Sequence, residues 1–272
     1  MIRRPATAKI NLALLVGATR PDGKHEVATI LQRLDLADRV ALRPASGLEV
    51  HGFAEDSLVR AALVALAETA GTEPAWTATI TKRIPVAAGL GGGSSDAATA
   101  LLLANQTLPE PLLDEQLTAI AAGLGADIPF FLTQGPQLGE GDGTELAPLE
   151  LPQDYYVVLV LPGAVVKTST AEAYAAFDER GGAKGFRNRR AALRRALAQI
   201  ERPRDLAALP ANDLVSSPVA DELLARGAFR ADVSGAGPTV YGLFTRRDDA
   251  AAARKALGTL GKTWLTVPAW YG

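Results

Sequence analysis

Residues 85–98 read Pro85-Val86-Ala87-Ala88-Gly89-Leu90-Gly91-Gly92-Gly93-Ser94-Ser95-Asp96-Ala97-Ala98. The segment before them, 77–84, alternates enough to predict a strand, and the apolar run 97–104 after them predicts a helix. Glycine allows tight turns and lets a backbone approach a ligand closely. The first turn of a helix adds N–H groups without intrahelical partners, at the positive end of the helix dipole, and these suit a phosphate. The stretch therefore predicts a phosphate-binding loop between a strand and a helix.

The two serines of this loop have two interpretations. Their hydroxyls could bind a phosphate oxygen or a metal ion. Alternatively, the loop is a flexible turn in which Ser94 or Ser95 caps the helix. The loop is not a Walker A loop, because no Gly-Lys-Ser/Thr follows at the required spacing. It is also a poor dinucleotide fingerprint, which belongs after the first strand of a βαβ unit.

The composition excludes several classes of protein. The chain has 272 residues, 48% of them hydrophobic, and a net charge of −2, which suits one large globular domain or two smaller ones and predicts no nucleic-acid partner. It has no cysteine and two histidines, His25 and His51, so disulfides, cysteine-based zinc sites and histidine-rich metal centres are excluded. Residues 1–9 lack the apolar core of a signal peptide, and no apolar run is long enough to span a membrane. We therefore expect a cytoplasmic protein with no membrane partner.

Predicted strands and helices follow one another irregularly. Strands are predicted at 7–16, 38–42, 48–52, 156–161 and 263–267, with two more around a glycine-rich turn in 229–244. Helices are predicted at 57–70, 113–124, 187–199, 219–226 and 248–257, and the basic face of 187–199 is interpreted as solvated surface. Residues 134–143 predict a loop or hairpin, and the proline-containing segment 146–154 is the candidate domain boundary. The lack of regular βαβ alternation favours an α+β fold.

The glycine loop resembles the phosphate-binding motif of the GHMP kinases, which include galactokinase, homoserine kinase and mevalonate kinase. Three further segments resemble the same family, in the family's order. The first joins Ala8-Lys9-Ile10-Asn11-Leu12 to Pro21-Asp22-Gly23-Lys24-His25-Glu26 and Leu34-Asp35-Leu36-Ala37-Asp38. The others are Leu124-Gly125-Ala126-Asp127-Ile128-Pro129-Phe130-Phe131 and Val233-Ser234-Gly235-Ala236-Gly237-Pro238-Thr239-Val240. Together the four blocks span most of the chain.

This resemblance implies a two-domain GHMP kinase fold. An N-terminal nucleotide-binding domain would occupy residues 1–152 and a ferredoxin-like C-terminal domain residues 153–272, with the active site in the cleft between them. ATP would be the phosphoryl donor, bound by residues Pro85–Ser95. Mg²⁺ would be carried mainly by the ATP phosphates, with Ser95 as the nearest protein group and no metal ligand assigned.

The resemblance also implies two catalytic residues. Asp127 would be the base that accepts the acceptor's hydroxyl proton. Lys9 would keep this carboxylate ionised and stabilise charge on the transferring group. Taken without the resemblance, Asp127 reads as a cap for the turn that begins at Pro129, and Lys9 reads as an edge-strand lysine directed at solvent.

Four residues are implied in binding the acceptor. Asn11 would lie beside Lys9, because side chains two apart on a strand face the same way; its alternative is a hydrogen bond to backbone at a strand end. His25 belongs to the block that binds a cytidine group in one branch of the family. Tyr174 would be the second aromatic wall of that pocket, or else a core tyrosine on a short helix. Gly235 lies in a turn expected close to the phosphate loop, or in a simple β-turn.

The resemblance is strongest to the branch that phosphorylates the 2-hydroxyl of 4-diphosphocytidyl-2-C-methyl-D-erythritol in the non-mevalonate isoprenoid pathway. The chain departs from that branch at Lys24, where tyrosine is usual. The expected function is therefore an ATP-dependent small-molecule kinase whose substrate carries a cytidine diphosphate group, acting as a monomer or homodimer. The alternatives are another GHMP kinase, of homoserine or mevalonate type, and a non-catalytic nucleotide-binding sensor on the same fold.

Overall fold

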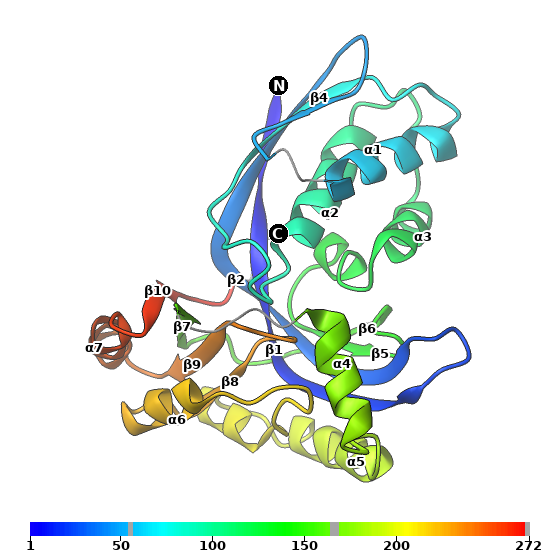
Figure 1. Ribbon diagram of the computed structural model, residues 1–272. Coiled ribbons are helices and arrows are strands. Elements are labelled where there is room, and N and C mark those ends of the chain that lie inside the picture. Colours follow the sequence, from blue (N-terminus) through cyan, green and yellow to red (C-terminus); the bar gives the residue numbers. More distant parts are fainter. Residues whose placement is uncertain (54–56, 164–168, 270–272) are drawn as a thin grey trace. The chain divides into compact units, whose positions relative to one another are not determined.

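A computed structural model describes residues 1–53, 57–163 and 169–269 (Figure 1). The chain forms two compact units. Unit 1 comprises Met1–Ala8, Leu36–Ala87 and Gly91–Gln134, and unit 2 comprises Lys9–Asp35, Ala88–Leu90 and Gly135–Gly272. The segment 146–154 therefore lies within unit 2. The division differs from a single cut in the sequence because strands β1 (Ile2–Thr19) and β2 (His25–Pro44) each contribute to both units.

Unit 1 combines short strands with a group of helices. In this unit β2 pairs antiparallel with β4 (Trp76–Thr81), and β3 (Glu49–His51) pairs parallel with β4. The helices are α1 (Ser57–Ala70), α2 (Gly92–Asn105), α3 (Asp114–Leu124) and the short η1 (Pro129–Leu132). Helix α2 is buried along most of its length, because its alanines and leucines pack against α1 and η1.

The first sheet of unit 2 contains β1, β2 and a hairpin. Strand β5 (Gln137–Glu140) pairs antiparallel with β2 and with β6 (Glu145–Pro148), so the hairpin alternative predicted for 134–143 is confirmed. Strand β2 is much longer than the predicted strand 38–42. Its residues 27–34 are buried without interruption, and such a strand lacks the alternation by which a half-buried strand is recognised.

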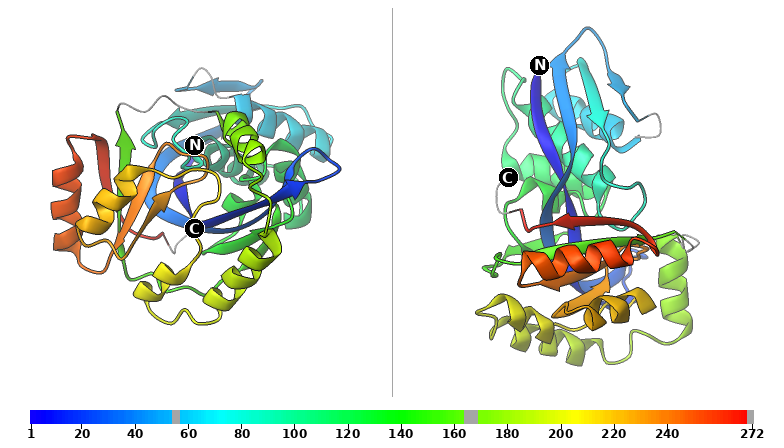
Figure 2. Two further views of the ribbon diagram at one scale, coloured as in Figure 1. Left: turned by 60° about the horizontal axis from the view of Figure 1, so that its bottom comes forward. Right: turned by 90° about the vertical axis from the view of Figure 1, so that its left-hand side faces the viewer.

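The second sheet of unit 2 is antiparallel and has the strand order β10-β7-β9-β8. Its strands are β7 (Tyr156–Pro162), β8 (Arg230–Val233), β9 (Val240–Phe244) and β10 (Gly261–Thr266). Helices α6 (Pro218–Ala225) and α7 (Arg247–Leu257) pack on it around one apolar core (Figure 2). This order, with a helix between β9 and β10 and helices between β7 and β8, confirms the predicted ferredoxin-like arrangement.

Three further helical segments connect β7 to α6: α4 (Thr170–Glu179), α5 (Phe186–Leu197) and η2 (Pro203–Ala208). Helix α6 begins as predicted, with the Ser217 hydroxyl accepting from the Val219 N–H and Pro218 in its first position. Over the residues described, the structure has no helix that is long and apolar enough to cross a membrane.

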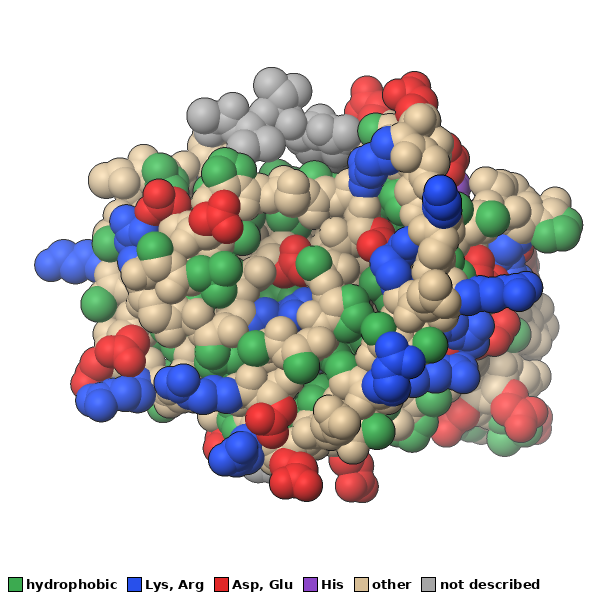
Figure 3. Space-filling model, turned by 90° about the horizontal axis from the view of Figure 1, so that it is seen from below, with side chains coloured by type: hydrophobic (Ala, Val, Ile, Leu, Met, Phe, Trp, Pro, Cys, Tyr) green, Lys and Arg blue, Asp and Glu red, His purple; other side chains and the backbone are tan. Residues whose placement is uncertain are grey.

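The basic helix α5 is only in part a solvated surface. Arg187, Arg194 and Arg195 are exposed, whereas Arg189 and Arg190 are half-buried. Arg190 and Arg194 both pair with Glu140, and their hydrogen bonds lower the pKa of that carboxyl although burial opposes them. Figure 3 shows Lys and Arg side chains spread over one face of the molecule with Asp and Glu side chains among them.

Candidate active site

The glycine-rich loop joins helix α2 at a residue whose backbone adopts the left-handed conformation. Gly91 is the N-cap of α2, with φ 68°, and Gly89 has φ 79°. Glycine adopts this conformation without steric cost. Because Gly91 has no side chain, it cannot cap the N–H groups of the first turn, and they remain available to an anion. The alternative in which Ser94 or Ser95 caps the helix is wrong, since both lie inside α2.

A buried ion cluster supports the unit 1 part of the loop. Lys82, just after β4, donates to Asp38 at 2.5 Å and to Asp96 in α2 at 2.7 Å, and both carboxylates are fully buried. Burial opposes the charge of Lys82, but the two hydrogen bonds raise its pKa overall. Asp38 also accepts from the N–H groups of Arg83 and Ile84. The cluster thus ties the end of β4 to the helix that follows the loop, a connection that the sequence analysis missed.

If residues 85–95 bind the ATP phosphates, as the sequence predicts, substitutions at this loop weaken ATP binding. Gly91→Val places a β-branched residue at positive φ, and a Cβ at Gly92 would lie 3.1 Å from the Ile84 side chain. Strain of this kind costs on the order of 1–3 kcal/mol, so we expect ATP affinity to fall by about tenfold or more. Isothermal titration with ATP measures this, with circular dichroism as the check on folding.

The matched control for these variants is Gly123→Ala. Gly123 lies in α3 of the same unit, and a Cβ there meets nothing within 4 Å. If Gly91→Val and Gly92→Val bind ATP as tightly as the control does, the nucleotide binds elsewhere.

In unit 2, Lys9 and Asn11 form a buried polar chain on β1. The Lys9 ammonium donates to Asn11 Oδ1 at 2.8 Å, and Asn11 Nδ2 donates to Thr29 Oγ1 at 2.8 Å. Thr29 Oγ1 in turn donates to the Ala13 carbonyl. Lys9 is 3% exposed, so its interpretation as an edge-strand lysine directed at solvent is wrong. The predicted shared face of Lys9 and Asn11 is confirmed by their hydrogen bond, and Thr29 is an addition that the sequence analysis missed.

The turn between β8 and β9 lies beside the unit 2 part of the loop, as predicted. Ser234 Oγ donates to the Gly89 carbonyl at 2.9 Å. A Cβ at Gly89 would lie 2.4 Å from the Ser234 carbonyl oxygen, so only glycine fits there. Gly235 has φ 60°, and a Cβ on it would lie 3.5 Å from Asn11 Oδ1 and 3.7 Å from Lys9 Nζ. Lys9, Asn11 and Gly235 therefore come together within unit 2.

Asp127 lies in unit 1, in the connection between α3 and η1, and is half-buried. The neighbouring Ile128 and Phe130 are fully buried and anchor this connection. Ile128, not Asp127, occupies the N-cap position of η1, and the Ile128 side chain makes no capping hydrogen bond. Both interpretations of Asp127, as a base and as a cap of the turn at Pro129, stay predictions.

His25 and Tyr174 form an aromatic pair in unit 2. Their ring centroids are 4.7 Å apart with planes at 34°, and the Phe177 ring meets His25 edge-on at 6.2 Å. Asp178, one helical turn after Tyr174 on α4, lies 2.9 Å from His25 Nε2. The structure thus joins two residues predicted to bind the substrate and adds Asp178, which no local sequence signal indicates.

Lys24 is engaged with a carboxylate of the β5–β6 hairpin. Its ammonium lies 2.5 Å from Asp142 Oδ2. Burial acts to raise the pKa of Asp142, but hydrogen bonds from Lys24 and Thr144 outweigh it and lower that pKa to about 2. Lys24, which replaces the usual tyrosine, therefore forms an ion pair with another residue of unit 2.

The sequence predicts that Mg²⁺ arrives with the nucleotide and is not held by a cage of protein ligands. Among the residues in 1–53, 57–163 and 169–269, no three His, Asp or Glu side chains gather to hold a metal. Mg²⁺ binds readily to phosphate oxygens and keeps several waters, so it needs no such cage. Ser95, the predicted neighbour of the ion, lies in the first turn of α2 and is 1% exposed.

Comparison with known proteins identifies the class of this fold and site. The family model described as GHMP kinases N terminal domain matches residues 57–135, and the model described as GHMP kinases C terminal matches residues 183–263. The glycine loop before α2 falls within the first match, and strands β8 and β9 of the ferredoxin-like sheet fall within the second. With the relatives described next, these matches show that the chain belongs to the GHMP kinase family.

Two curated relatives align with almost the whole chain and have the same name. A 4-diphosphocytidyl-2-C-methyl-D-erythritol kinase of Geobacter sp. (strain M21) is 40% identical, over 95% of this chain and 94% of its own. One of Pelobacter propionicus (strain DSM 2379 / NBRC 103807 / OttBd1) is 36% identical, over 97% and 96%. The crystal structure of 4-(cytidine 5'-diphospho)-2C-methyl-D-erythritol kinase matches with a TM-score of 0.81 and 33% identity, covering 100% of both chains. A mevalonate kinase structure, with a TM-score of 0.74 at 13% identity, shares the fold.

Proposed function

We propose that the protein transfers the γ-phosphoryl group of ATP to the 2-hydroxyl of 4-diphosphocytidyl-2-C-methyl-D-erythritol. The products are the 2-phosphate and ADP. The observation that carries the proposal is the whole-length similarity to kinases named for this substrate. The His25–Tyr174 pair supports it, because the two side chains that the sequence predicts for the cytidine pocket lie against each other.

The proposed reaction is an in-line displacement at phosphorus. The acceptor oxygen bonds to the γ-phosphorus as the bond from that phosphorus to the β-phosphate oxygen breaks, and the hydroxyl proton passes to the Asp127 carboxylate. The Lys9 ammonium, oriented by Asn11, stabilises charge on the transferring group. The N-terminus of α2 and residues 85–95 hold the ATP phosphates. Mg²⁺ would neutralise further phosphate charge.

Recognition of the cytidine group is assigned to unit 2. The Tyr174 ring offers a face on which a base can stack, and His25 offers hydrogen bonds while Asp178 holds its ring nitrogen. Lys24 cannot stack as a tyrosine would, so we assign it to the ion pair with Asp142. The proposal further includes a cytoplasmic reaction by a monomer or homodimer.

His25→Ala should raise KM for the cytidine substrate by about tenfold and leave KM for ATP almost unchanged. Losing a hydrogen-bond partner and a ring contact costs about 1–2 kcal/mol. The matched control is His51→Ala, since the His51 side chain is 57% exposed and pairs with Glu49 at the surface. An equal rise of both KM values in His25→Ala would contradict the role of His25 in binding the cytidine group.

Lys24→Tyr, which restores the residue usual in the branch, should retain activity.

The proposed function is tested with ATP and a small panel of acceptors: the cytidine diphosphate alcohol, homoserine and mevalonate. We expect ADP release with the cytidine substrate alone, and competition by CDP or CMP against that substrate but not against ATP. Phosphorylation of homoserine or mevalonate would contradict the assignment to the cytidine-substrate branch, although the protein would still be a small-molecule kinase. ATP binding with no turnover of any acceptor would favour the sensor.

A further inference from the structure

Strand β8 begins with a buried arginine that has many partners. Arg230 is 6% exposed, and its guanidinium donates to the backbone carbonyls of Leu209 at 2.6 Å, Pro210 at 2.8 Å and Leu206 at 3.4 Å. It also lies 3.5 Å from Asp232 Oδ2. A buried charge is costly unless it is paired and hydrogen-bonded. The packing of a sheet strand does not require an arginine, so this one points to another role.

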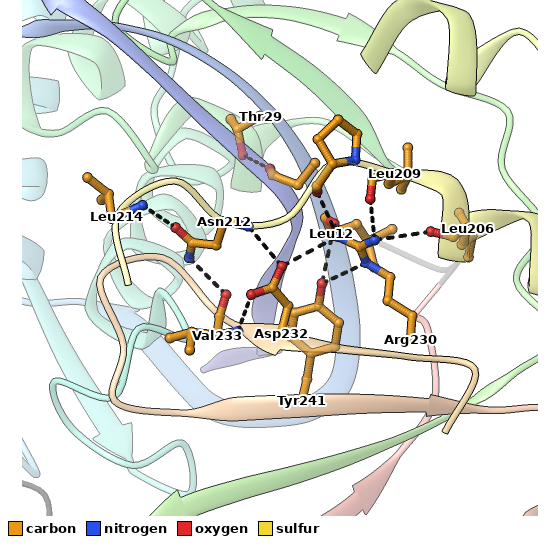
Figure 4. Close-up of polar contacts among 12 residues, drawn as sticks. Leu12, Thr29, Leu206, Leu209, Asn212, Leu214, Arg230, Asp232, Val233 and Tyr241 are labelled. Atoms are coloured by element: carbon orange, nitrogen blue, oxygen red, sulfur yellow. Dashed lines mark hydrogen bonds and ion pairs between the residues drawn. The ribbon is translucent and has the colours of Figure 1, made fainter. Parts of the chain in front are cut away.

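One end of the Arg230 network reaches the strand that carries Lys9. Arg230 Nη2 donates to the Leu12 carbonyl at 2.6 Å, and the Tyr241 hydroxyl donates to the same oxygen at 3.3 Å. Leu12 is adjacent to Asn11 and three residues from Lys9 on β1. The next carbonyl, that of Ala13, accepts from Thr29, which also holds Asn11. The β1 backbone next to Asn11 is therefore held by Arg230 and Tyr241 at Leu12 and by Thr29 at Ala13; Figure 4 shows the contacts at Leu12.

The other end of the network reaches the turn that contains Gly235. Asp232 accepts from the Asn212 N–H at 2.9 Å and from the Val233 N–H at 2.8 Å. Asn212 Nδ2 donates to the carbonyls of Val233 at 3.0 Å and Gly235 at 2.7 Å. Asn212 Oδ1 accepts from the Leu214 N–H. All the hydrogen-bonding groups of this amide are thus used, and Gly235 is held by its carbonyl while its other side faces Lys9 and Asn11.

We propose that Arg230, Asp232 and Asn212 are positioning residues that hold β1 and the Gly235 turn in register, and so set where the Lys9 ammonium and Asn11 amide lie. They act through the backbone of Leu12 and Gly235. The inference rests on the proposed function in that Lys9 acts on the transferring phosphoryl group. A misplacement of a catalytic group by about 1 Å can cost on the order of 10²-fold in rate.

The test compares Asn212→Ala with Asn105→Ala. Asn105, in unit 1, is a buried asparagine that clamps a loop in the same way, by two hydrogen bonds to the backbone of Leu112. We expect Asn212→Ala to lower kcat by about 10- to 100-fold with KM for ATP within about threefold, because the Lys9 ammonium, which acts on the transferring group, has been moved. Asn105→Ala should keep kcat within about threefold. Urea unfolding establishes that each variant is folded during the assay. Equal kcat values in the two variants would overturn the proposal.

A double-mutant cycle asks whether Asn212 acts through Lys9. In a Lys9→Met background, the further change Asn212→Ala should lower kcat by less than about threefold, because there is no ammonium left to position. Fully additive losses would overturn the proposal. Arg230→Lys, which keeps a charge beside Asp232 but loses the planar fork, should behave as Asn212→Ala does. If Arg230→Lys does not fold, the double-mutant cycle of Asn212 and Lys9 still tests the proposal.

A readout without turnover separates this inference from the proposed function. The Hζ–Nζ signal of Lys9 in ¹⁵N-lysine NMR spectra, assigned by its absence in Lys9→Met, reports the hydrogen bond from Lys9 to Asn11. We expect it to shift in Asn212→Ala and to stay in place in Asn105→Ala; no shift in Asn212→Ala would overturn the inference. If the protein phosphorylates another acceptor, the proposed function fails, and the cycle is measured with that acceptor. If it phosphorylates none, the NMR comparison alone decides.

Discussion

Asp127→Asn should lower kcat by about 10²- to 10⁴-fold while ATP binding stays within about twofold. General-base catalysis contributes a factor of this size, and an amide cannot accept the acceptor's hydroxyl proton. Asparagine has nearly the shape of aspartate, so the connection between α3 and η1, anchored by buried Ile128 and Phe130, should keep its structure. Steady-state kinetics with the cytidine substrate and calorimetric titration with ATP measure the two effects separately.

The control for this variant is Asp114→Asn. Asp114 is an exposed aspartate at the start of α3 in the same unit, and its loss affects only the first turn of that helix. Its kcat should equal that of the unchanged protein. Turnover of Asp127→Asn close to that of Asp114→Asn would remove Asp127 from the mechanism.

Lys9→Met should lower kcat by about 10²- to 10³-fold. Removing one preorganised donor that faces developing charge typically has an effect of this size. Methionine occupies a similar volume and is at ease in a buried position, and Lys9 is 3% exposed, so the change removes the ammonium with little loss of packing. Asn11 Oδ1 loses its Lys9 donor, and for this reason stability must be measured along with activity.

The control for Lys9→Met is Lys262→Met, which alters an exposed lysine on β10. The kcat of this control should be unchanged. Lys9→Arg is expected to recover little activity, because a planar guanidinium does not place its charge where a compact ammonium does. If Lys9→Met turns over within threefold of the control, then Lys9 only supports the strand.

Much of the fold follows from local sequence. Gly91 and Gly92 stand where the loop turns into α2, and the apolar run behind them forms a buried helix. Pro218 and Ser217 begin α6 where they should. Strand β2 was largely missed because residues 27–34 are all buried, with Thr29, Gln32 and Arg33 among them, so apolar and polar residues do not alternate along it. The division into units was also not visible, because β1 and β2 are single strands in sequence and belong to both.

The sequence by itself determined the family, and it predicted a phosphate-binding loop and the candidate groups Lys9, Asn11, His25 and Asp127. These predictions rest on residue types at short spacings, and such local patterns can be recognised without the tertiary structure. Only the tertiary structure decided which groups are joined to them. Asp178 meets His25 across 153 residues, and Arg230 meets the Leu12 carbonyl across 218. Such partners are chosen by the pairing of strands and the packing of helices, and they satisfy buried polar groups that local sequence does not link.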